Sequence, residues 1–172
     1  MSSSEVLKKQ YQKKTDKEHI LDNPDTYIGS VESIEDAGYV FENEKMKLEN
    51  CTYIPGLYKL FDEAIVNCRD HSIRMKNSIN NIQLTNIEVT VEDNMFSFKN
   101  DGNGIDVVKH PEYDIWIPEM IFAHLRTGTN YDKEEKRIVG GKNGFGAKLI
   151  FIWSTYGRLE TVDHTRKLKF VQ

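Results

Sequence analysis

The sequence is poor in cysteine and in long apolar runs, and each shortage excludes a class of protein. Its 172 residues include only Cys51 and Cys68, which are too few for a disulfide framework and have no metal-ligand spacing. This cysteine usage favours a reducing, intracellular compartment. No apolar run approaches the ~18 residues of a membrane span, and the N-terminus lacks the apolar segment of a secretory signal. We therefore expect no membrane partner.

Basic charge is also in short supply. The net charge is −4, whereas a surface that grips duplex DNA usually carries a basic patch. The chain is therefore not expected to be the main DNA-gripping surface, although an enzyme acting on DNA can carry basic surfaces elsewhere. Hydrophobic residues at 38% and charged residues at 29% fit a globular protein, and the length fits one domain.

Glycine is concentrated in one stretch, residues 140–148, with four glycines in seven positions followed by an apolar segment. Glycine lets backbone N–H groups approach a ligand closely, and a helix that begins just after such a loop adds partial positive charge. The stretch therefore favours phosphate binding, while a surface loop with accidental glycines remains the alternative. It is not a Walker A motif, because Ala147 precedes Lys148 and Leu149 stands where Ser or Thr is required.

The clearest helix begins at Pro55-Gly56. Its apolar stripe has helical spacing and consists of Leu57, Leu60, Phe61, Ala64, Ile65 and Cys68. Glu63 and Asn67 are four residues apart, so they share a second face of this helix. A carboxylate beside a carboxamide suits a water-activating base next to a Mg²⁺ ligand. An ordinary exposed polar face is the alternative.

The hydrophobic period then changes from helical to alternating. Residues 87–91 and 96–98 predict a hairpin that turns at Asp93-Asn94. At its far end lies Asn100-Asp101-Gly102-Asn103-Gly104, where two glycines permit close backbone approach to a flat ligand. The Asn100 side chain can read a purine edge by paired hydrogen bonds. A simple turn is the alternative for this segment.

The remaining segments are predicted more coarsely. We expect a hairpin or loose strands within residues 31–54, a helix starting at Pro118, another over residues 145–154, and a strand pair at 159–162 and 168–171. The long polar segment 126–139 precedes the glycine loop and is interpreted as a lid, with a plain solvated loop as the alternative. Because the chain stops inside the last strand, we expect sequence beyond Gln172 in the parent protein.

Taken in order, these motifs resemble the GHKL ATPase superfamily. Within it the sequence resembles the N-terminal ATPase domain of type IIA DNA topoisomerases, in the branch of eukaryotes and large DNA viruses. The phrases that carry the resemblance cover essentially the whole chain and are Glu18–Leu21, Pro24–Ser30, Pro55–Glu63, Thr129–Asp132 and Gly140–Lys148.

The resemblance implies an α+β fold, the GHKL or Bergerat ATPase sandwich, with helices on one face of a mixed, mainly antiparallel sheet. It implies a flexible N-terminal arm at residues 1–19 and an ATP-binding domain at residues 20–172 that is incomplete at its C-terminal end. The arm, including Tyr11, is expected to cross to a second subunit in a homodimer.

The resemblance also assigns roles to particular residues. Glu63 is expected to be the general base, Asn67 the ligand of Mg²⁺, and Asn100 the residue that reads adenine. The other expected contacts to ribose and phosphates are Gly128, Thr129, Asn130, Gly141, Lys142, Asn143, Gly144, Phe145, Gly146, Ala147 and Lys148, with Arg74 near the phosphates.

Four positions depart from the family pattern. His71 replaces the usual Asn, and Asn23 stands where Arg normally precedes the Pro-Asp pair. Lys142 and Phe145 replace the common Arg and Tyr, which removes bidentate bonding and a hydroxyl contact. None of these changes involves Glu63 or Asn67.

The resemblance implies the function of a larger enzyme. Binding of ATP with Mg²⁺ is expected to close a dimeric gate, and hydrolysis to reset it, which drives passage of duplex DNA in the full-length protein. The expected location is the nucleus or, for a viral protein, the host cytoplasm or virus factory. The alternatives are a truncated or degenerate nucleotide-binding module that regulates a full-length partner, and another GHKL ATPase.

Overall fold

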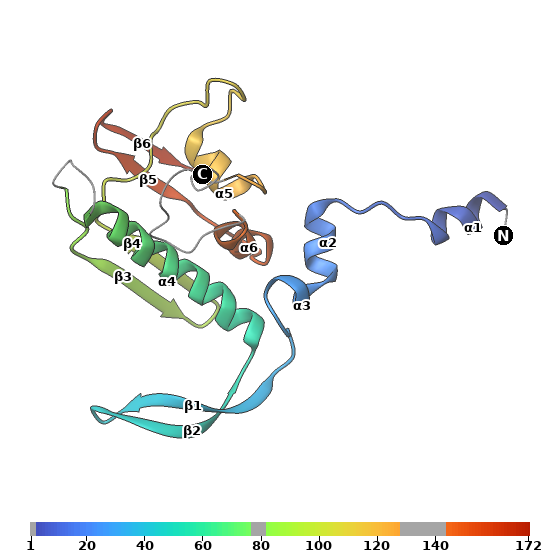
Figure 1. The fold of residues 1–172 in the computed structure, drawn as a ribbon, viewed down its shortest axis with the longest axis horizontal. Helices are drawn as coiled ribbons and strands as arrows, with labels where there is room; N and C mark the ends of the chain where they lie inside the picture. Colours follow the sequence, from blue (N-terminus) through green and yellow to red (C-terminus); the bar gives the residue numbers. More distant parts are fainter. Residues whose placement is uncertain (1–2, 77–81, 128–143) are drawn as a thin grey trace.

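A computed structural model describes residues 3–76, 82–127 and 144–172 (Figure 1). The helices are α1 (Ser3–Gln10), α2 (Asp16–Asp22), α3 (Pro24–Tyr27), α4 (Pro55–Lys76), α5 (Ile117–Ala123) and α6 (Gly146–Ile152). The strands are β1 (Ile34–Glu42), β2 (Lys45–Tyr53), β3 (Ile87–Glu92), β4 (Met95–Asn100), β5 (Glu160–Asp163) and β6 (Leu168–Val171).

The described strands form antiparallel hairpins. β1 pairs with β2, β3 with β4, and β5 with β6. The first residue pair of each ladder is Ile34 with Tyr53, Ile87 with Asn100, and Glu160 with Val171. In the described part of the chain each hairpin is a separate two-stranded ladder. Helices and antiparallel strands in one chain confirm the predicted α+β class, and the predicted hairpins and strand pair are confirmed at these places.

Helix α4 is the central element of the packing. Pro55 occupies its first turn, where a missing N–H costs nothing. One side of the helix packs against β4, where the Phe61 ring lies 6.0 Å from that of Phe96 and 5.1 Å from that of Phe98. In the predicted apolar stripe Leu60 and Cys68 are buried, but Leu57 is 55% exposed because no described element covers the first turn at this point.

A second contact joins α4 to the helix that follows the glycine loop. Leu60 of α4 and Leu149 of α6 are both buried and form the core cluster with Ile20 and Ile28. Figure 1 shows α4 running along the β3–β4 hairpin, with α6 near its side and α5 next to α6. The core thus places the start of α6 against the middle of α4.

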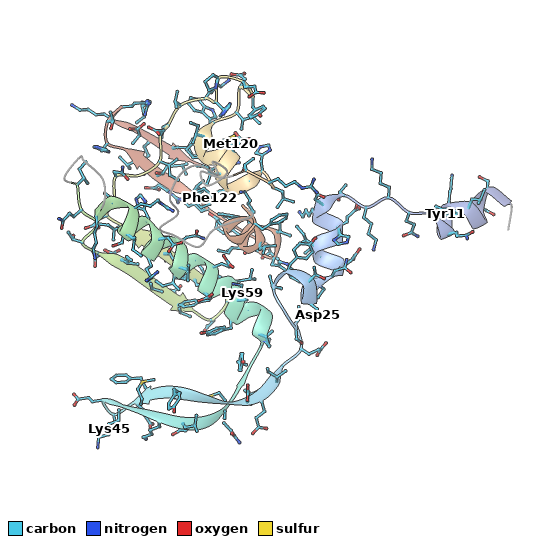
Figure 2. All side chains as sticks on the ribbon, in the orientation of Figure 1. Tyr11, Asp25, Lys45, Lys59, Met120 and Phe122 are labelled. Atoms are coloured by element: carbon cyan, nitrogen blue, oxygen red, sulfur yellow. The ribbon has the colours of Figure 1, made fainter. Side chains whose placement is uncertain are left out.

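The N-terminal segment contains more regular structure than its composition indicates. Thr15 caps α2 in a reciprocal capping box with Glu18, and the helix ends at Asp22, just before Pro24 starts α3. Since α2 begins at Asp16, a helix crosses the expected boundary between residues 19 and 20. Figure 2 places Tyr11 at the end of α1, far from the packed elements, and its side chain is 72% exposed. The flexibility of the arm stays a prediction.

The β1–β2 hairpin projects from the body of the molecule, with Lys45 at its tip (Figure 2). It connects the Gly29 turn to the start of α4, and the Gly56 N–H donates to the Ser30 carbonyl oxygen at 2.8 Å. Gly29 adopts a φ of +94°, which a side-chain-bearing residue rarely does. None of the described helices has both the length and the apolar character needed to cross a membrane.

Candidate nucleotide-binding site

Glu63 and Asn67 lie on one face of α4, as their spacing predicts. The Asn67 Nδ2 atom donates to the Glu63 carbonyl oxygen at 2.6 Å, which fixes the Asn67 side chain along the helix. The Glu63 Oε1 atom pairs with Lys59 Nζ at 2.6 Å, and the carboxylate raises the pKa of that lysine. Because the Glu63 side chain remains 24% exposed, its carboxylate is partly accessible to solvent.

The other carboxylate oxygen of Glu63 faces the glycine loop. A Cβ atom on Gly146 would collide with Glu63 Oε2 and would lie 3.9 Å from Asn67 Nδ2. Only glycine therefore fits at the first residue of α6 while Glu63 keeps this position. The structure brings together the candidate base, the candidate metal ligand and the described end of the glycine loop.

Lys148 is buried in the first turns of α6, with 4% of its surface exposed. Its Nζ atom donates to the Gly144 carbonyl oxygen at 2.5 Å and to the Thr127 carbonyl oxygen. Burial lowers the pKa of Lys148 to about 8, because desolvation penalises the charged ammonium. The lysine thereby connects the glycine loop to the end of the α5 region, and an anion placed nearby would stabilise its charge.

Asn100 ends β4 and lies beside α4. Its Oδ1 atom accepts a hydrogen bond from the Gly102 N–H at 3.1 Å, and its Nδ2 atom donates to Cys68 Sγ at 3.9 Å. An Asn carboxamide has two acceptor and two donor positions, so these contacts leave one of each for a ligand. Cys68 is adjacent in sequence to Asn67, so α4 positions both the candidate metal ligand and the candidate base reader.

The turn after Asn100 is held by β5, through residues that the sequence pattern does not single out. Thr161 Oγ1 accepts from the Ile105 N–H at 2.9 Å, and Asp163 Oδ2 accepts from the Val107 N–H at 2.9 Å. Both side chains are buried. Thr161 and Asp163 point inward from alternate positions of β5, where apolar residues would be expected. Polar residues at the inward positions of a strand are the only signal in the sequence that could have identified them.

Arg74 and His71 occupy the end of α4. Arg74 is exposed in the last turn. His71 is half-buried, and burial followed by the nearby Arg74 charge lowers its pKa, while a hydrogen bond with the Asn103 side chain acts in the opposite direction. Arg74 therefore lies on the same helix as Glu63 and Asn67, about three turns further along the chain.

The structure describes only part of the predicted site. Gly144, Phe145, Gly146, Ala147 and Lys148 are described and lie at or near the start of α6. The expected lid lies almost wholly outside the described residues. Six of the predicted site residues also lie outside the described residues, so their roles stay predictions: Gly128, Thr129, Asn130, Gly141, Lys142 and Asn143.

The described residues give one end of a binding site with complementary chemistry. A partly exposed carboxylate, a carboxamide and a buried ammonium come from the packed helices α4 and α6. A second carboxamide, that of Asn100 at the end of β4, has free donor and acceptor positions and lies beside Cys68 of α4. This arrangement suits a ligand with an anionic end and a flat hydrogen-bonding end. Among the described residues no cluster of three or more His, Cys, Asp or Glu side chains forms an independent metal site.

Known proteins with similar sequences agree with this geometry, although no protein-family model matches the chain. DNA topoisomerase 2 of Acanthamoeba polyphaga mimivirus is 44% identical over 172 residues, which covers 96% of this chain and 13% of that protein. DNA topoisomerase 2 of Plasmodium falciparum is 46% identical over 173 residues, covering 99% of this chain and 12% of that protein.

Solved structures agree as well. The ATPase region of Saccharomyces cerevisiae topoisomerase II superposes with a TM-score of 0.86 at 44% identity, covering 95% of this chain and 43% of that one. The ATPase and transducer domains of DNA topoisomerase II from Balamuthia mandrillaris give a TM-score of 0.89 at 44% identity, covering 96% and 41%.

The fold is therefore that of a GHKL ATPase domain, as the sequence predicted. More specifically, the chain is homologous over nearly its whole length to the N-terminal ATPase region of DNA topoisomerase II. It spans little more than a tenth of the length of the topoisomerases that it matches, at 13%, 12% and 11% of the first three.

Proposed function

We propose that this chain binds ATP together with Mg²⁺ and contributes the residues that hydrolyse it. The contact between Glu63 Oε2 and the Gly146 backbone carries the proposal most directly. It places a carboxylate with partial solvent access at the end of a glycine loop, where a terminal phosphate and an attacking water would meet. Homology to topoisomerase II ATPase regions supports the same ligand.

The roles follow from the chemistry of each side chain. Glu63 would accept the proton of the attacking water, and its ion pair with Lys59 would hold the carboxylate in place. Asn67 would offer its amide oxygen to Mg²⁺, since its Nδ2 atom is already occupied by the Glu63 carbonyl oxygen. When bound, Mg²⁺ supplies charge neutralisation for the phosphate oxygens. Lys148 would face the phosphates, and Asn100 would read adenine.

The described residues fit Mg²⁺ because of the type of atom that they offer to it. The amide oxygen of Asn67 is an oxygen ligand of the kind that Mg²⁺ prefers, and the cation usually keeps several waters. Gly146 leaves the space next to the Glu63 and Asn67 side chains free of a Cβ atom. The described residues therefore fit Mg²⁺ held by one protein ligand and phosphate oxygens.

Replacing Glu63 by Gln tests the catalytic role. The substitution removes the basic carboxylate but keeps the size and one amide oxygen, so we expect ATP binding to change by less than about threefold and turnover to fall by about 10²–10⁴-fold. Asp62→Asn is the matched control, because Asp62 also pairs with Lys59 but lies 41% exposed outside the Glu63–Gly146 contact. Equal loss of turnover in both variants would contradict the assignment.

For the parent protein we propose the activity of a DNA topoisomerase II. ATP binding would close a dimer of ATPase regions, with the N-terminal arm crossing to the partner, and hydrolysis would reopen it during passage of duplex DNA. Its relatives are topoisomerases of eukaryotes and of a virus, which supports an intracellular site of action, either the nucleus or a viral factory. ATP-dependent relaxation of supercoiled plasmid by the parent protein tests this activity.

A regulatory module is the second candidate. His71 departs from the family pattern on the helix that carries Glu63 and Asn67, which favours a module that binds nucleotide without completing hydrolysis. Binding of ATP without measurable turnover by the chain, together with inhibition of a full-length topoisomerase II when the chain is added, would favour this function.

A further inference from the structure

A histidine packs against the turn that follows Asn100. A Cβ atom on Gly102 would lie 2.6 Å from His71 Nε2 and 2.9 Å from Met75 Sδ, so these two side chains occupy the space of any larger residue. His71 and Met75 are four residues apart and share one face of α4. Gly102 is therefore held tightly against the helix.

The position of Gly102 determines how the neighbouring carboxamide points. The Gly102 N–H can only donate, and it donates to Asn100 Oδ1 at 3.1 Å. This contact fixes the oxygen of the carboxamide on one side and directs the Nδ2 atom toward Cys68 Sγ on the other. If Gly102 moved away from α4, the orientation of Asn100 would no longer be fixed.

His71 has an environment that favours its neutral form. Burial is the largest cause of its lowered pKa, and the charge of Arg74 on the next turn adds to it. On α4 itself, the nearby Asp70 is buried and pairs with Arg69 at 3.7 Å. That carboxylate is thus already engaged with a cation of its own.

The charged and titratable groups of the turn are also engaged elsewhere. The Asp101 carboxylate accepts hydrogen bonds from the Thr85 and Asn86 N–H groups at 2.8 and 2.9 Å. From the β5–β6 side, His164 Nδ1 lies 3.1 Å from the Asn103 carbonyl oxygen. Among the described residues, no carboxylate on these elements is directed at the His71 ring, and Asn103 is the group that favours its protonation.

The surroundings of the His71 ring oppose its protonation. The Asn103 side chain favours the charged form, but burial and the charge of Arg74 outweigh it, since the pKa of His71 is lowered. An imidazolium here would be a partly buried charge next to Arg74, which favours movement of the ring away from its packing on Gly102.

We propose that neutral His71 is a positioning residue that holds Gly102 against α4 and thereby orients the Asn100 carboxamide for a nucleotide base. The identity of the ligand rests on the proposed function, but the positioning itself is a property of the chain without nucleotide. Protonation of His71 releases the turn. Base recognition in this chain consequently weakens in acid, in a range set by this histidine.

Amide hydrogen exchange of Gly102, measured by NMR on the full chain without nucleotide, tests the positioning directly. We expect His71→Ala to speed exchange at Gly102 by about tenfold, the equivalent of about 1.4 kcal/mol of lost protection. Exchange at Val107, which Asp163 protects independently, should stay unchanged. Unchanged exchange at Gly102 in His71→Ala would overturn the proposal, whether or not the chain binds ATP.

A second test uses the steric contact itself. Gly102→Ala places a methyl group against His71, so it should loosen the Asn100 turn and speed amide exchange at Asp101 and at position 102. In a His71→Ala background the same substitution should have a smaller effect, because the space is partly vacated and Met75 is flexible. Equal effects in the two backgrounds would overturn the proposal.

Nucleotide binding gives the third test. Affinity for a non-hydrolysable ATP analogue with Mg²⁺ should fall progressively as the pH is lowered from 7 to well below 6.5, the ordinary pKa of histidine, because protonation of His71 releases the turn. His71→Asn should remove this dependence, while His110→Asn, at an exposed turn, should retain it. If wild type binds no analogue at any pH the proposed function fails, and the exchange tests decide the positioning. If His71→Asn keeps the wild-type pH profile, the positioning role is wrong.

Discussion

The Glu63 Oε2 atom occupies the space that a side chain on Gly146 would fill. The carboxylate of α4 therefore lies directly against the backbone at the start of α6. This contact forms because Leu60 and Leu149 pack in the same core cluster and bring the two helices together. A helix face that resembles an ordinary polar surface in sequence thus becomes one wall of the proposed site.

Gly146→Ala should impair turnover with little loss of stability. The new methyl group would displace the Glu63 carboxylate, whereas alanine in place of glycine favours the helix by up to about 1 kcal/mol. ATP hydrolysis should fall at least tenfold while the melting temperature stays near the wild-type value. Gly38→Ala is the control, since its Cβ atom would meet only Cys51 Sγ at an ordinary 3.8 Å. Normal turnover by Gly146→Ala would show that the contact has no catalytic importance.

When nucleotide binds at alkaline pH, Lys148 should take up a proton. The pKa of Lys148 is lowered to about 8 by burial, so its charge costs stability below that pH, and stability recovers as pH rises toward 10.5. Phosphates next to the ammonium would raise the pKa again. Calorimetry in buffers of different ionisation enthalpy should therefore detect uptake of part of a proton at about pH 8.5 and almost none at pH 7.

Lys148→Arg supplies the comparison for this proton uptake, because a guanidinium stays charged throughout the range. The variant should bind the nucleotide without the extra proton. Identical proton uptake by both proteins would place its origin in another group and would contradict the role given to Lys148.

Acid should loosen the segment after Asn100. The Arg166 N–H, followed by the Val107 N–H and the Arg166 guanidinium, lowers the pKa of the Asp163 carboxyl below its ordinary value of 3.8. A carboxyl with a lowered pKa contributes stability that is present above pH 3.8 and lost as pH falls below it. Asp163→Asn should lower the melting temperature at pH 7 and reduce its dependence on acid. Asp106→Asn, at an exposed carboxylate, should lower the melting temperature less and change its dependence on acid less. Melting curves of both variants and of the wild type at pH 7 and pH 3 test this difference.

Local sequence patterns predict most of the described fold. The stripe around Leu60 predicts α4, and alternation predicts the β3–β4 hairpin, because each pattern reflects burial along a single element. Leu57 breaks the pattern because burial of a side chain in the first turn depends on which other segments cover it, and the described segments leave Leu57 exposed. Spacing on one helix likewise places Glu63 beside Asn67.

The contacts that complete the site join distant parts of the sequence. Asn100 contacts Cys68 from 32 residues away, and Thr161 and Asp163 each hold backbone N–H groups 56 residues away. No periodicity encodes such pairs. The buried polar side chains of β5 are explained only when the unpaired N–H groups of the turn are seen next to them. The contact between Glu63 Oε2 and the Gly146 backbone is likewise visible only in three dimensions.

Calorimetric binding of a non-hydrolysable ATP analogue to this chain, with and without Mg²⁺, tests the central claim most directly. We predict binding that requires Mg²⁺ and that Asn67→Ala weakens by about tenfold or more, equivalent to at least about 1.4 kcal/mol. Circular dichroism and a cooperative melt establish that both proteins are folded. A folded chain that binds no analogue, or that binds it equally well without Mg²⁺ and in Asn67→Ala, would contradict the account.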